Sequence, residues 1–178
     1  IVKNNIYFKY KTTFIMQVHG LIHQFPKEIK LVIIAFIVVL SIGFYGGLSF
    51  VNNTTSMSST GVETHYLGNE ADEDAEIMKF KKNEREILTI VHNHILSLSV
   101  IFFLLALILA TTSINKKLKY FLMLEPFLSI LLTFGGIYLL WKGVVWFKYV
   151  VIFSGSLMTA TFVVSTLSIL YQLFFSKK

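Results

Sequence analysis

Four long apolar stretches constrain the fold of this chain more than any other feature of its sequence. They cover residues 31–51, 87–114, 118–141 and 149–176 and are almost free of charged side chains. A hydrocarbon core about 30 Å thick is crossed by about 20 helical residues. Lipid offers backbone groups no hydrogen-bonding partner, so spanning segments of this composition form helices. The sequence therefore predicts an all-α, polytopic membrane protein with four transmembrane helices.

The composition agrees with a protein dissolved in lipid. Of the 178 residues, 54% are hydrophobic and 15% are charged, unlike a soluble domain of this length. A chain this short forms one domain, held together by helix packing within the lipid bilayer. Cysteine is absent, which excludes disulfides, thiolate metal sites and iron–sulfur clusters. The net charge is +6, but the basic residues stand at the ends of the apolar stretches, so we expect no nucleic-acid partner.

The connections between the spans predict their arrangement. Residues 52–86 form a polar loop, whereas residues 115–119 and 142–148 make short connections. Short connections force neighbouring helices to run antiparallel, so we predict an up-down four-helix bundle. Residues 1–30 are predicted to be an N-terminal cytoplasmic or interfacial segment, because apolar and polar residues alternate there as in an amphipathic helix. We expect Met16 to be the natural start, with residues 1–15 upstream of it.

Charge asymmetry predicts the orientation in the membrane. Lysines stand before the first span, between the second and third, and at the end of the chain, as Lys27, Lys30, Lys116, Lys117, Lys119, Lys177 and Lys178. Lys and Arg favour the cytoplasmic side, so we expect both termini there, in a bacterial inner (cytoplasmic) membrane. Residues 52–86 then form an outer loop that holds eight of the ten acidic residues. Acids lead and bases follow over residues 69–86, which predicts a surface helix there, whereas residues 52–60 are predicted to be irregular.

His92 and His94 stand at the outer end of the second span and are candidate ligands of haem b or a metal ion. Positions two apart on a helix point about 200° away from each other, so one helix cannot aim both rings at one ion. A second ligand would come from His65 in the outer loop or from a partner chain. The alternative is an ordinary interfacial position, with one ring bonded to the loop and the other in water. His19 and His23 have metal-binding spacing, but they lie in the amphipathic segment, where His is a common polar residue.

Glu125 is the one carboxylate within the predicted spans, and Pro126 follows it. A carboxylate inside the membrane is a candidate for proton exchange or cation binding. Pro126 leaves the carbonyl of Leu122 without its helical donor and can kink the helix. The alternative is that Glu125 reaches the membrane surface or pairs with a lysine of residues 115–119.

Small residues on several spans predict close helix packing, because backbones approach where side chains are small. These candidate packing residues are Gly43, Gly47, Gly135, Gly136, Gly155 and Thr159. Since they occur on more than one helix, some faces are expected to meet a membrane protein partner or another copy of the chain. Residues 45–47 resemble residues 134–136, an aromatic residue before two glycines, which either a duplicated helix hairpin or chance explains.

The sequence offers no support for an enzyme, because it has no nucleophile with a base, phosphate-binding glycine loop or metal-ligand quartet. Two hypotheses follow. The favoured one is a small non-catalytic integral membrane subunit that packs within a larger respiratory or transport complex. The alternative is a redox or cation-handling membrane protein that binds haem or metal through an outer histidine and exchanges protons at Glu125.

Overall fold

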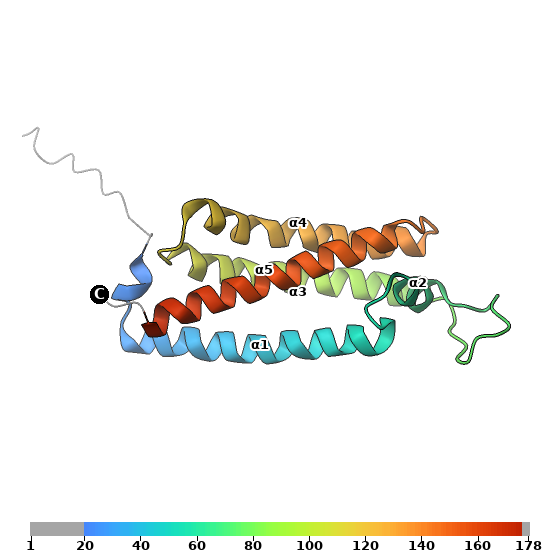
Figure 1. Cartoon of the computed structure of the whole chain (residues 1–178), viewed down its shortest axis with the longest axis horizontal. Coiled ribbons are helices and arrows are strands. Elements are labelled where there is room, and N and C mark those ends of the chain that lie inside the picture. The colour runs from blue at the N-terminus through green and yellow to red at the C-terminus, as the bar shows by residue number, and fades with distance from the viewer. Residues whose placement is uncertain (1–19, 176–178) are drawn as a thin grey trace, which may run out of the picture.

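A computed structural model of the chain describes residues 20–175, and all their regular structure is helical. The elements are the short 3-10 helix η1 (Leu21–Gln24) and the α-helices α1 (Lys27–Thr55), α2 (Ser59–Leu67), α3 (Glu84–Ala110), α4 (Lys116–Trp141) and α5 (Phe147–Phe175). Of these, α1, α3, α4 and α5 are long and apolar enough to cross a membrane. They lie roughly alongside one another as an elongated bundle (Figure 1). The prediction of an all-α protein with four spans is confirmed.

Polar residues at the helix ends set the bounds of the spans. Asn83 and Glu86 form a capping box at the start of α3, each side chain accepting a hydrogen bond from the other residue's backbone N–H, at 2.9 and 3.1 Å. At the other end, the hydroxyls of Thr111 and Thr112 donate to the carbonyls of the last turn, both at 2.6 Å. Such caps satisfy backbone groups that a helix leaves unpaired. For this reason α3 starts at Glu84, before the apolar stretch, and ends at Ala110, short of the predicted 114.

The helix of the outer loop is not where its charges predict it. We expected a helix over residues 69–86 and irregular chain over 52–60, but α1 continues to Thr55 and α2 occupies Ser59–Leu67. Residues 68–83 instead form a closed loop around Asn69, whose side-chain oxygen accepts from the Lys79 N–H at 2.6 Å and whose amide donates to the Ile77 carbonyl at 3.1 Å. Such local bonds compete with a helix, and a favourable order of charges contributes only about 0.3–1 kcal/mol.

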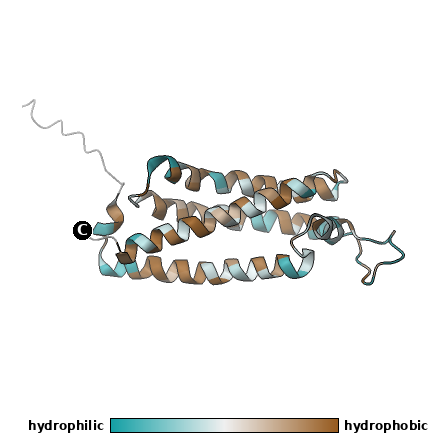
Figure 2. Cartoon of the chain, viewed as in Figure 1, coloured by the Kyte–Doolittle hydropathy of each residue, from teal (hydrophilic) through white to brown (hydrophobic). Residues whose placement is uncertain are grey.

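The core of the bundle lies around α4, and α1 is peripheral. Half of the residues in the most apolar stretch of α4 are buried, whereas only 11% of the residues in the most apolar stretch of α1 are buried. α4 packs on both α3 and α5, while α5 crosses the bundle obliquely from the outer end of α4 to the start of α1 (Figure 1). α1 contacts the bundle through Ile33 and Ile37, which are buried, and through Phe44, whose ring stacks on Phe162 at 4.0 Å. Apolar residues dominate the length of all four spans, and hydrophilic residues the helix ends and outer loop (Figure 2).

The segment before α1 is docked on the connection between α3 and α4. The backbone N–H of Gly20 donates to the Thr112 carbonyl at 3.3 Å, that of Ile22 donates to the Thr111 carbonyl at 3.1 Å, and the Ile22 side chain is fully buried. His23 Nε2 lies 3.2 Å from the Ser113 hydroxyl. The predicted metal partner of His23, His19, lies outside the described residues, as do Met16 and residues 1–15.

Candidate functional site

A buried carboxylate joins α4 to α5 inside the membrane-spanning bundle. The Glu125 residue is 8% exposed, and hydroxyls from both helices donate to its oxygens. Thr161 on α5 donates to Oε2 at 2.6 Å, and Ser129, one turn further along α4, donates to Oε1. Glu125 is thus held at the interface between two spans and does not extend toward the membrane surface.

Hydroxyls continue along the same interface on both sides of Glu125. On α4 the spacing is four residues, from Glu125 to Ser129 to Thr133, which keeps all three on one helix face. Thr133 and Ser154 of α5 bring their hydroxyl oxygens to 2.7 Å. We call this set the polar seam: Glu125, Ser129 and Thr133 of α4 with Ser154, Thr161 and Ser165 of α5, all buried. The hydroxyls of Thr161 and Ser165 are visible in the sequence, where they are compatible with a polar path or with helix packing.

Ser165 is exceptional within the polar seam. Its side-chain oxygen is the one buried side-chain nitrogen or oxygen in residues 20–175 that has no hydrogen-bond partner. Thr133 faces Ser154 and Glu125 faces Thr161, so in these antiparallel helices Ser165 comes one turn further, at the level of Leu122. The carbonyl of Leu122 has lost its helical donor to Pro126, which is itself fully buried within a continuous α4. By this register, two oxygens without their usual partners occur at one level, about one helical turn from the level of Glu125 along the α4–α5 interface.

Lys119, at the inner connection, bonds to backbone carbonyls at the end of α3. The Lys119 ammonium donates to the carbonyls of Ala110, at 3.0 Å, and Thr112, at the end of α3. The ion pairs of the described residues, Lys142–Glu84 and Lys148–Glu63, are both at the outer end. Pairing of Glu125 with a lysine of this connection, the alternative left open by the sequence, is not what the structure shows.

The outer histidines lie in different surroundings. The ring of His94 stacks on Phe134 of α4, with centroids 4.7 Å apart, and its Nδ1 lies 2.8 Å from the Ile90 carbonyl. His92 is exposed, and His65, on α2, packs edge-to-face on Tyr66. Within the described part of the chain, no three His, Cys, Asp or Glu side chains are grouped so that they could hold a metal ion. Binding of haem or metal by these histidines stays a prediction.

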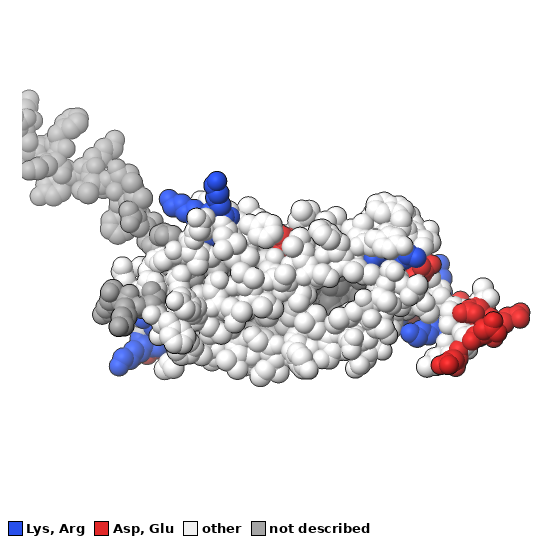
Figure 3. All heavy atoms as spheres, viewed as in Figure 1, with Lys and Arg blue, Asp and Glu red and all other residues white. Residues whose placement is uncertain are grey.

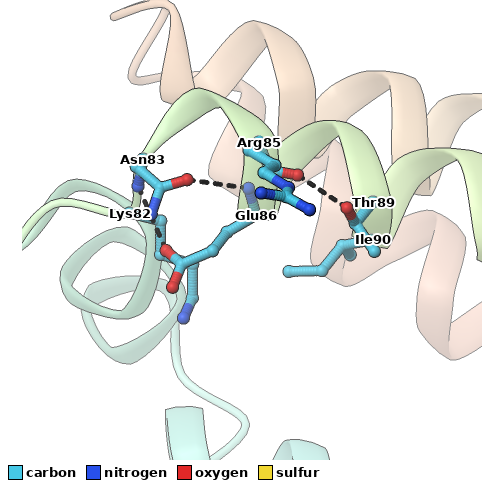
Figure 4. Close-up of a pocket in the computed structure, with 6 residues that line it drawn as sticks. All are labelled: Lys82, Asn83, Arg85, Glu86, Thr89 and Ile90. Carbon is cyan, nitrogen blue, oxygen red and sulfur yellow. Dashed lines mark hydrogen bonds between the residues drawn. The ribbon is translucent and has the colours of Figure 1, made fainter.

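A shallow hollow lies at the start of α3. It has a volume of about 360 Å³ and is lined by Lys82, Asn83, Arg85, Glu86, Thr89 and Ile90 (Figure 4). Asn83 and Glu86 bond to each other's backbone, and the Thr89 hydroxyl donates to the Arg85 carbonyl at 2.7 Å. These bonds stabilise the first turns of α3, and this structural role explains why polar groups line the hollow.

Burial affects two side chains of α2. Burial first, and then the charges of Lys82 and Lys79, lower the pKa of His65 below its usual value, and burial raises the pKa of Tyr66 to about 12. The folded protein therefore holds His65 neutral where the unfolded chain would protonate it. Folding stability from this group is present above pH 6.5, the ordinary His value, and is lost as the pH falls toward the folded-state pKa.

We expect acidification to loosen α2 for this reason. Hydrogen exchange of the α2 amides, corrected for the intrinsic effect of pH, should become faster as the pH drops below 6.5. A His65→Gln variant, which cannot gain the proton, is the control and should lose this dependence. Equal pH dependence in both proteins would show that another group is responsible.

The glycines predicted to pack are divided between the inside and outside of the bundle. A side chain at Gly136 would meet Val151 at 3.0 Å, and one at Gly155 would meet Thr133 at 3.9 Å, so both glycines face the α4–α5 interface. Gly43, Gly46, Gly47 and Gly135 have nothing within 4 Å of the corresponding position. The hydroxyl of Thr159 bonds to the Gly155 carbonyl of its own helix at 2.9 Å. The three glycines of α1 therefore form an open face, which we call the α1 glycine face.

Comparison with known proteins places the larger part of the chain in a protein family. No curated protein and no solved structure matches it. The family model Aq_1264_TM, a transmembrane helical domain, matches residues 56–178. The match begins immediately after Thr55, the last residue of α1, and includes α2, α3, α4 and α5. The protein is a membrane protein, and the chain belongs to the Aq_1264_TM family of transmembrane helical domains.

Proposed function

We propose that this protein is a small non-catalytic integral membrane subunit that packs α1 against a helix of another membrane protein. The observation that carries the proposal is the α1 glycine face. Only 11% of the most apolar part of α1 is buried in its own bundle, and Gly43, Gly46 and Gly47 meet no neighbour within 4 Å. In addition, α1 lies outside the matched family domain.

The physical reason concerns what glycine does inside a membrane. Glycine costs a helix about 1 kcal/mol relative to alanine and offers lipid tails no side chain to pack against. Its use in membrane helices is to bring two backbones close together. α1 contacts its own bundle through Ile33, Ile37 and Phe44, whereas Gly43, Gly46 and Gly47 are exposed. The glycine face is therefore available to a helix from outside the chain.

We place the ends of α1 and α5 that lie near η1 on the cytoplasmic side of a bacterial inner membrane. The charge distribution supports this orientation: Lys27, Lys30 and the lysines of the α3–α4 connection lie at that end, and the acidic side chains gather at the opposite end with the outer loop (Figure 3). Of the basic residues at the outer end, Lys142 and Lys148 pair with Glu84 and Glu63. Orientation follows the bias of Lys and Arg, and acidic residues contribute little to it, so the lysines at the η1 end support the proposed orientation.

Single-cysteine cross-linking in native membranes tests the proposed contact, and the absence of cysteine from the chain makes the experiment clean. We expect Gly43→Cys and Gly47→Cys variants, treated with a short cysteine-to-amine reagent, to give an adduct with a different membrane protein, identified by mass spectrometry. Tyr45→Cys is the matched control. It lies at nearly the same depth but about 160° around the helix from Gly43.

Adducts at both glycine positions and few at position 45 would support the proposal. Equal adducts at all three positions, or none at the glycines, would contradict it. Adducts consisting only of two copies of this chain would replace the partner with a second copy and overturn the proposed occupant.

A further inference from the structure

We propose that the polar seam contains an intramembrane binding site for a monovalent cation, H⁺ or Na⁺, centred on the Glu125 carboxylate. This inference concerns the α4–α5 interface and does not depend on α1 or on its partner. It rests on three observations: a buried carboxylate without a cationic partner, a surrounding set of oxygen atoms, and one of those oxygens left without a hydrogen bond.

The first step concerns charge. The described residues provide Glu125 with two hydroxyl donors, Ser129 and Thr161, and no ion pair. An ionised carboxylate in apolar surroundings is costly unless its charge is compensated, and hydrogen bonds from neutral hydroxyls compensate only part of that cost. A bound proton or a bound alkali cation supplies the missing positive charge.

The second step concerns the surrounding groups. The side chains that α3 buries in its inner half are apolar, namely Phe102, Leu105, Ala106 and Leu109. Most charged residues and histidines of the elements packed on α4 lie toward the helix ends: Glu84, Arg85, Glu86 and His92 on α3, Glu63 and His65 on α2, Lys148 on α5, and Lys116, Lys117 and Lys119 on α4 itself. His94 lies deeper, but it stacks on Phe134, about two turns beyond Glu125 toward the outer end. Glu125 is therefore the one carboxylate in the interior of the described spans.

The third step concerns the ligand atoms. Hard cations take oxygen ligands, and unpaired backbone carbonyls inside membrane helices are used for Na⁺. The Glu125 carboxylate has the Ser129 and Thr161 hydroxyls beside it, and about one turn along the interface come two oxygens that lack their usual partner, the Ser165 hydroxyl and the Leu122 carbonyl. A polar side chain 1% exposed and without a hydrogen bond is costly, so Ser165 is explained by a ligand that it contacts.

Carbodiimide labelling tests the site in the full chain. Dicyclohexylcarbodiimide enters membranes and reacts with carboxyl groups in their protonated form, so the labelling rate at Glu125, followed by mass spectrometry, reports its occupancy. We expect labelling at acidic pH that slows as the pH rises. If Na⁺ shares the site, NaCl will slow labelling at constant pH relative to choline chloride, and if the site takes only H⁺, the two salts will act alike. No labelling of Glu125 at any pH, or labelling independent of both pH and Na⁺, would overturn the proposal.

Two serine variants test the ligand set. Ser165→Ala removes the unpaired oxygen and leaves both hydrogen bonds to Glu125 in place, so the fold should tolerate it. It should shift the H⁺ or Na⁺ concentration of half-maximal labelling about tenfold, the effect of one hydrogen bond to a charged group. Ser154→Ala, in the same seam but bonded to Thr133, is the matched control and should leave the midpoint unchanged. Equal midpoints in both variants would remove Ser165 from the site, and Glu125→Gln should abolish labelling.

Discussion

Replacing Gly136 with leucine should push the outer halves of α4 and α5 apart and lower the free energy of unfolding by about 2–3 kcal/mol. A Cβ atom at this position would lie 3.0 Å from Val151 Cγ2 and 3.5 Å from Phe147 Cδ1. Helices in lipid are held together largely by close packing, so a loss of contact is not offset by a hydrophobic force between them. The Thr133–Ser154 hydrogen bond lies about one turn away and should lengthen as well.

The neighbouring glycine provides the control. Gly135 is in the same helix but has nothing within 4 Å of its Cβ position, so Gly135→Leu should change stability by less than about 0.5 kcal/mol. Both variants can be compared by unfolding in sodium dodecyl sulfate, followed by tryptophan fluorescence, because Trp141 is largely buried and donates to the Lys82 carbonyl at 2.7 Å. Similar losses at positions 135 and 136 would contradict the packing described here.

A single methyl group at Gly61 should detach α2 from the end of α1. An added Cβ would lie 1.8 Å from the Thr55 carbonyl oxygen and 2.6 Å from its carbon. These are backbone atoms at the end of α1, so the turn between α1 and α2, which we call the corner, must open. The corner is already tight, since Ser56 and Met57 have left-handed backbone angles and the Ser58 N–H donates to the same Thr55 carbonyl at 3.1 Å. We expect a local cost of about 3 kcal/mol or more.

Hydrogen exchange measures this effect where it occurs. In Gly61→Ala, amides of residues 56–68 should exchange at least tenfold faster, whereas the interior of α3, α4 and α5 should keep its protection. Gly46→Ala adds the same methyl group to an open position of α1 and should leave exchange unchanged or slower. Unchanged exchange of α2 in the Gly61 variant would show that the corner is looser than its contacts indicate.

The four spans could be predicted because lipid thickness imposes a length and because a charge within that length is costly. The loop helix could not, because its position depends on bonds among residues distant in sequence. Asn69 closes its loop onto Lys79, and Lys148 of α5 pairs with Glu63 of α2 at 2.5 Å. The charge pattern of residues 69–86 alone therefore does not predict where the loop helix lies.

Glu125 could be predicted as a candidate residue, but its surroundings could not. A lone carboxylate in an apolar span is conspicuous in the sequence, whereas the Thr161 hydroxyl becomes its neighbour only through the register of α4 against α5. The same holds for the glycines: Gly135 and Gly136 are adjacent in sequence, yet only Gly136 faces α5. Spacing indicates small residues suited to packing, and the helix rotation decides which of them pack.

The peripheral place of α1 has a consequence for how the protein is assembled in the cell. During synthesis α1 leaves the ribosome before α3, α4 and α5, yet one of its main contacts, the stacking of Phe44 on Phe162, needs α5. It must therefore remain in lipid while α3 and α4 insert as a hairpin closed by Lys119 at its inner end. Until α5 arrives, the first helix is as accessible to a newly made partner as to its own chain.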